Sequence, residues 1–71
     1  MTTLSNSDKI VIIDQKIKNL DYQRYSVNLD IQLEGSVSTP DQDNLDSLNV
    51  KLSDIVTKLD ILNTEKTSLI E

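Results

Sequence analysis

The chain has no cysteine, histidine, alanine, phenylalanine or tryptophan, and it contains a single glycine and a single proline. Without cysteine it can form neither a disulfide scaffold nor a thiolate metal site. Its serines have no histidine to activate them, and no glycine-rich phosphate loop or His/carboxylate metal motif is present. Carboxylates are numerous, but a thin helical protein offers no cleft in which to desolvate them. These absences predict a protein that is not an enzyme and that uses no cofactor, metal or small-molecule substrate.

Long hydrophobic runs are also missing. The longest apolar run is 10–13, far short of the ~20 residues that a membrane-spanning helix needs. The N-terminal residues show no basic stretch ahead of an apolar one, so no signal peptide is predicted. Much Ile, Asn, Asp, Lys and Ser without Ala is typical of an AT-rich genome, as in a phage or a low-GC bacterium. We expect a cytoplasmic or virion-associated protein.

The charge balance limits the partners. The net charge is −5, with twelve acidic residues along the chain rather than in a tail, among seven Lys and Arg. Direct binding to nucleic acid or to an anionic membrane needs a basic face and is therefore not expected. Mimicry of DNA by the acidic residues is a minor alternative, because basic residues are interleaved with them.

Apolar residues in the first half recur at alternating spacings of three and four, the heptad pattern of a helix packed along one stripe. This seam consists of Ile10, Ile13, Ile17, Leu20, Val27 and Ile31, with Arg24 in the remaining position. The residues at 5–7 offer N-cap oxygens, and Gly35 suits the left-handed position just past a helix end. A helix over about 7–34 is predicted.

The second half begins with a helix-start signal after a linker over about 35–39. Thr39 is a suitable N-cap, Pro40 suits the first helical position, and Gln42 completes a capping box. The heptad then continues through Leu45, Leu48, Leu52, Ile55, Leu59, Leu62 and Leu69, interrupted at Lys66. A calcium loop over the aspartates at 41, 43 and 46 is disfavoured, because leucines stand at two of its ligand positions. A second helix over about 40–70 is predicted.

Folding the chain back at the linker brings both seams into register, because the numbers of facing positions add to 75 or 76. This predicts an all-α fold, an antiparallel, coiled-coil-like two-helix hairpin that forms one domain over 1–71. A short loop favours the closed hairpin over a swapped dimer. A chain of 71 residues is small for a self-supporting core, so assembly into a multi-chain helical bundle is expected.

The first helix carries a second apolar stripe almost opposite its seam, at about 100° per residue. We call this the α1 stripe, and it consists of Val11, Tyr22, Tyr25, Leu29 and Leu33. Apolar residues on a second side of a helix usually meet another chain or element. The α1 stripe therefore predicts either a homo-oligomer interface or a binding surface for a helix of another protein.

Arg24 has two interpretations at this stage. Its side chain either extends out of the seam to an acid such as Asp21, or it fixes register or oligomer order by pairing with an acid of another chain. The sequence as a whole predicts a non-enzymatic structural or assembly protein, such as a phage virion or assembly component. The alternative is a small acidic regulator or inhibitor that binds a helix or groove of a target protein.

Overall fold

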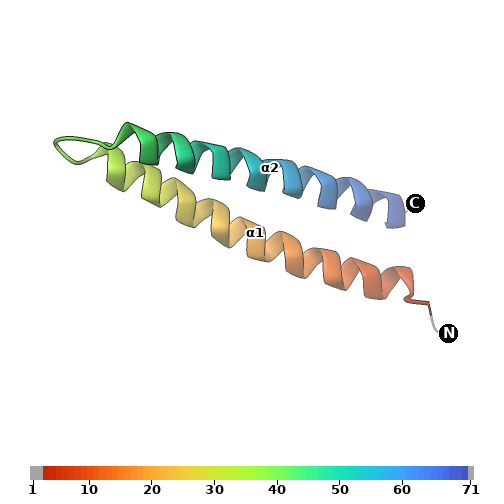
Figure 1. The fold of residues 1–71 in the computed structure, drawn as a ribbon. Coiled ribbons are helices and arrows are strands. Elements are labelled where there is room, and N and C mark those ends of the chain that lie inside the picture. The colour runs from red at the N-terminus through yellow and green to blue at the C-terminus, as the bar shows by residue number, and fades with distance from the viewer. Residues whose placement is uncertain (1–2, 71) are drawn as a thin grey trace.

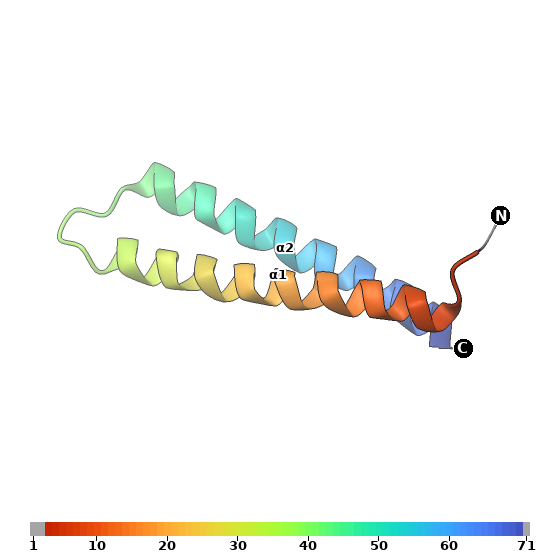
Figure 2. The ribbon, with the colours of Figure 1, turned by 90° about the horizontal axis from the view of Figure 1, so that it is seen from below.

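The computed structural model describes residues 3–70, which form two α-helices, α1 (Asn6–Gly35) and α2 (Gln42–Ile70). The helices run antiparallel and side by side, and both chain ends lie away from the linker (Figure 1). A view from below shows the same arrangement (Figure 2). The hairpin measures 57 × 22 × 15 Å. The prediction of an all-helical chain whose two helices pack against each other is confirmed.

Helix α1 starts at a serine cap. Ser5 is extended, with φ −69° and ψ 161°, and its Oγ accepts a hydrogen bond from the backbone N–H of Asp8 at 3.1 Å. This bond satisfies one of the N–H groups that a helix start leaves without a partner. The carboxylate of Asp8 also lies in the first turn, where the positive end of the helix dipole favours it.

The end of α1 differs from the prediction. Gly35 is its last helical residue and does not have a positive φ, so the expected left-handed turn is wrong. The final turn is instead closed by Ser36, whose N–H donates to Leu33 O at 3.3 Å and whose Oγ donates to Gln32 O at 2.6 Å. Because these bonds satisfy terminal carbonyls, a left-handed residue is not needed there.

Helix α2 starts two residues later than predicted. Asp41 caps it, because its Oδ1 accepts the N–H of Asn44 at 3.2 Å and its backbone oxygen accepts the N–H of Leu45 at 3.0 Å. Thr39 and Pro40 therefore stay in the linker, and their predicted roles as N-cap and first helical residue are wrong. Aspartate is the stronger N-cap of the two, which explains why the helix starts from it.

The predicted capping box is also absent from the structure. The side chain of Gln42 does not reach back to Thr39 but donates from Nε2 to Asp46 Oδ1 at 2.8 Å, one turn further along α2. The linker consequently spans 36–41, rather than 35–39.

The core is a single row between the helices. Val27, Ile55 and Leu59 form its buried cluster, and Ile17, Leu20, Ile31, Leu48 and Leu52 pack against it. Ile13 is also buried, whereas Ile10, Leu45, Leu62 and Leu69 at the other seam positions are half-buried. Among residues 3–70 no side chain is less than 2% exposed. Two helices thus shield one line of side chains and leave the rest of their surfaces open.

Candidate interaction surfaces

The α1 stripe is exposed in the hairpin. Its five side chains are between 40% and 68% exposed, whereas Ile13 and Val27 on the opposite side of α1 are buried against α2. The ammonium of Lys18 lies 6.0 Å from the ring centroid of Tyr22 at the edge of the stripe. Helix α1 is therefore apolar on two sides, and α2 covers one of them.

Exposed apolar residues on α2 are more scattered. Val50 and Ile61 are 62% and 61% exposed and share one side of α2, whereas Val56 and Ile70, 49% and 66% exposed, lie on another side. Each of these pairs is separated by three turns or more, whereas Tyr22, Tyr25, Leu29 and Leu33 follow one another at single-turn spacing on α1. The exposed apolar residues are therefore more closely spaced on the back of α1, over 22–33, than on α2.

Arg24 leaves the buried row at its seam position. Its side chain is exposed, and its guanidinium lies 3.3 Å from the carboxylate of Asp21 on the same helix. This contact is the one expected if Arg24 extends out of the seam. A pair of this spacing on a helix surface is worth only about 0.2–0.5 kcal/mol.

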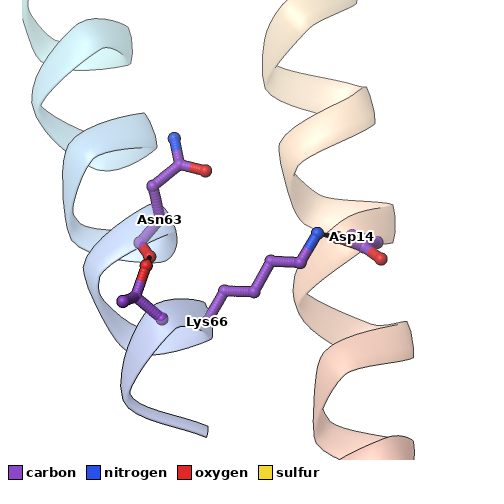
Figure 3. A network of polar contacts seen from close by, with 4 residues as sticks. Asp14, Asn63 and Lys66 are labelled. Carbon is purple, nitrogen blue, oxygen red and sulfur yellow. Dashed lines mark hydrogen bonds and ion pairs between the residues drawn. The ribbon is translucent and has the colours of Figure 1, made fainter. Parts of the chain in front are cut away.

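An ion pair that the sequence analysis did not find joins the open ends of the helices. Lys66 Nζ lies 2.7 Å from Asp14 Oδ1, and Figure 3 shows the lysine side chain reaching from α2 to α1. From the sequence, Lys66 is expected only to interrupt the heptad. Asp14 lies one turn from Ile10, which faces Lys66 in the predicted register, and this spacing was the available signal. Nearby, Asn6 Nδ2 donates to Leu69 O at 3.3 Å.

A shallow groove of about 360 Å³ lies between the helices at the linker end, and we call it the hinge groove. Its lining residues are Asp30, Leu33, Glu34, Val37, Asn44 and Leu48. Asn44 Nδ2 donates to Glu34 Oε1 at 2.9 Å, which ties the start of α2 to the end of α1. The groove therefore combines apolar side chains with two carboxylates.

The net charge of the chain is concentrated around this groove. Residues 25–50 contain no lysine or arginine, and their acids are Asp30, Glu34, Asp41, Asp43 and Asp46. The other seven acids are equal in number to the seven Lys and Arg of the chain, so their charges cancel. The linker end therefore carries the whole net charge of −5. The acids lie along the chain rather than in a tail, as expected, but a count between Arg24 and Lys51 shows that the net charge gathers in the middle of the sequence.

A second groove, of about 410 Å³, lies nearer the middle of the hairpin. Its lining residues are Lys16, Asn19, Leu20, Gln23, Lys58, Ile61 and Leu62. The charged side chains here are two lysines, one from each helix, so this groove has the opposite sign to the hinge groove. The hairpin thus offers three surfaces, namely an apolar stripe, a basic groove and an acidic groove, and Leu33 belongs to both the stripe and the acidic groove.

Comparison with protein-family models, with curated proteins and with solved structures finds no match. Within residues 3–70, neither helix has the length and apolar character needed to cross a membrane. What can be inferred about function therefore depends on the chemistry of the three surfaces.

Proposed function

We propose that this chain is a non-enzymatic structural or assembly protein that self-associates through the α1 stripe into a multi-chain helical bundle, as a phage virion or assembly component would. The observation that supports the proposal is the exposure of this stripe on a hairpin whose core is one row of side chains. Burying an apolar side chain of this size contributes about 1.5–3 kcal/mol. A second hairpin packed on the stripe would supply burial that the seam alone lacks.

The distribution of charge favours an antiparallel dimer of hairpins. Val11 and Leu33 lie equally far from Tyr22 along α1, so a twofold axis near Tyr22 would bring Val11 of one copy to Leu33 of the other. This arrangement also places the two acidic linker ends at opposite ends of the assembly. A parallel arrangement would bring both together, and their like charges would repel. The expected unit is a four-helix bundle.

Charged substitutions in the α1 stripe test this proposal. Leu29→Lys and Tyr25→Lys each place an ammonium in the interface, and both should shift the mass to that of a monomer and reduce helicity. Tyr25 is 68% exposed, so its replacement costs the isolated hairpin little. Ile61→Lys, at a position 61% exposed on α2, is the matched control and should change neither quantity much. Sedimentation equilibrium and circular dichroism across protein concentration measure both.

Two outcomes would contradict self-association through the α1 stripe. One is a monomeric mass for the unmodified chain together with a melting temperature that does not depend on protein concentration. The other is an assembly whose mass Tyr25→Lys and Leu29→Lys leave unchanged, because its contact would then lie outside the α1 stripe. Either result would move the α1 stripe to the alternative role, in which it binds a helix of a target protein.

A further inference from the structure

The hinge groove is a second interaction surface, separate from the centre of the α1 stripe. We propose that it binds a basic amphipathic helix of another protein, with apolar side chains in the groove and lysines or arginines against Asp30 and Glu34. Helix-in-groove recognition needs an apolar channel with flanking groups that select the charge of the partner. The hinge groove has both.

The apolar side chains at the rim of the groove are exposed, and the side chain at its base packs against the core. Leu33 and Val37 are 67% and 49% exposed in the single hairpin, and Val37 lies outside the α1 stripe, so it stays accessible when the stripe is covered. Leu48 is half-buried and packs against the core cluster, which holds the base of the groove in place. The hydrogen bond from Asn44 to Glu34 bridges the two walls. A docked helix would therefore meet a formed surface.

The carboxylates of the groove lie where the chain itself disfavours negative charge. Asp30 and Glu34 are four residues apart on α1, a spacing at which like charges repel. Glu34 also lies in the last turn of α1, near the negative end of the helix dipole. No lysine or arginine occurs over 25–50 to offset them. Cations on a partner would relieve this repulsion, which identifies a basic partner as the occupant.

Two other occupants fit less well. The linker end of a second copy carries the same charge of −5 and would be repelled. An acidic helix would instead be attracted to the groove lined by Lys16 and Lys58. The sign of the charge thus separates the two grooves, although both lie between the same two helices.

Binding can be measured with a fluorescein-labelled peptide of about 18 residues, roughly 27 Å as a helix, that carries leucine on one face and lysine on the other. A leucine/glutamine peptide of the same pattern, which carries no side-chain charge, is the control for hydrophobic adsorption. Fluorescence anisotropy with the whole chain should show saturable binding of the lysine peptide. The glutamine peptide should bind far more weakly, because it lacks the cations that meet Asp30 and Glu34.

Paired variants locate the binding site. Asp30→Asn with Glu34→Gln should weaken binding about fivefold, because each exposed charge pair contributes about 0.5 kcal/mol. Asp54→Asn with Asp60→Asn changes the net charge equally at exposed positions outside the groove, and it should leave the affinity nearly unchanged. Circular dichroism of both double variants checks that the hairpin is intact.

A second pair tests the apolar contact. Val37→Ser should weaken binding about threefold, since it removes apolar surface from the groove. Ile61→Ser, at an exposed position in the other groove, should have no effect. Leu33 is left unchanged because it also belongs to the α1 stripe. Neither substitution changes the α1 stripe. The mass of the assembly in sedimentation therefore tests self-association separately from peptide binding.

Three results would overturn the hinge-groove proposal. They are no binding of the lysine peptide, equal weakening by the two charge-matched double variants, and equal binding of the lysine and glutamine peptides. The second result would indicate general attraction to an acidic protein, and the third would indicate nonspecific hydrophobic adsorption.

Discussion

At the residue scale, the seam accommodates two cations by letting their charged ends leave it. Lys66 is half-buried and reaches Asp14 on α1, whereas Arg24 is exposed and reaches Asp21 on its own helix. Long aliphatic side chains allow this, because the methylene groups pack while the charged group stays in water. The seam therefore continues past both positions, but with less apolar burial there than a leucine would give.

Arg24→Leu should raise the melting temperature. The substitution loses a surface pair worth about 0.2–0.5 kcal/mol and adds an apolar side chain next to the buried row, where even partial burial contributes about 1 kcal/mol. Asp21→Asn breaks the same pair without adding apolar surface and should change stability little. Thermal denaturation with sedimentation measures both effects. A fall in stability for Arg24→Leu alone would show that Arg24 pairs with an acid of another chain.

At the scale of the helix, the start of α2 depends on Asp41. Asp41→Ala removes the side-chain cap from the N–H of Asn44 and should lower the free energy of unfolding by about 1 kcal/mol. Thr39→Ala lies two residues away in the linker and should cost far less. Chemical denaturation of the two variants gives the comparison. The reverse order of stabilities would mean that α2 begins at Pro40, as the sequence suggested.

At the end of α1, by contrast, a substitution is expected to stabilise the hairpin. Gly35 is helical without a positive φ, and a Cβ added there meets nothing within 4 Å. Gly35→Ala should therefore stabilise the hairpin by about 0.5–1 kcal/mol, because alanine loses less backbone entropy on entering a helix. The thermal melt of this variant is the measurement. A destabilised Gly35→Ala variant would indicate that the turn needs a left-handed residue after all.

The two helices could be predicted from sequence, but their ends could not. A heptad is a long signal, and residues such as Ile13, Val27, Ile55 and Leu59 repeat it many times. A cap depends on one side chain, and Thr39 and Asp41 are both good candidates two residues apart. The α1 stripe was found by the same periodicity. The hinge groove was missed because it combines Asp30 and Glu34 of α1 with Val37 of the linker, which no single period connects.

At the scale of the whole molecule, the hairpin is electrically divided. The sequence outside 25–50 has equal numbers of acidic and basic residues, and the ion pair between Lys66 and Asp14 joins the helices near the open end. The linker end carries the entire net charge. The two ends of the hairpin therefore differ in charge. Self-association through the α1 stripe depends on apolar side chains, whereas binding at the hinge groove depends on Asp30 and Glu34, so the two proposals use different charged groups. Leu33 is the one side chain that both proposals use.

The last prediction concerns the stability of the whole assembly. Four apolar side chains are buried in the isolated hairpin, while twelve large ones among the described residues are 40% or more exposed. A chain that buries so little should gain much of its stability from association, which makes folding depend on concentration by mass action. A hundredfold increase in protein concentration shifts the free energy by about 2.7 kcal/mol, which corresponds to a rise in melting temperature of roughly 10 °C for a dimer of this size. Circular dichroism melts of the unmodified chain measure this rise.

The same series with Tyr25→Lys should show almost no dependence on concentration, because the substitution removes the contact between chains and not the contact between the helices of one chain. A dependence of equal size in both proteins would place the contact between chains outside the α1 stripe.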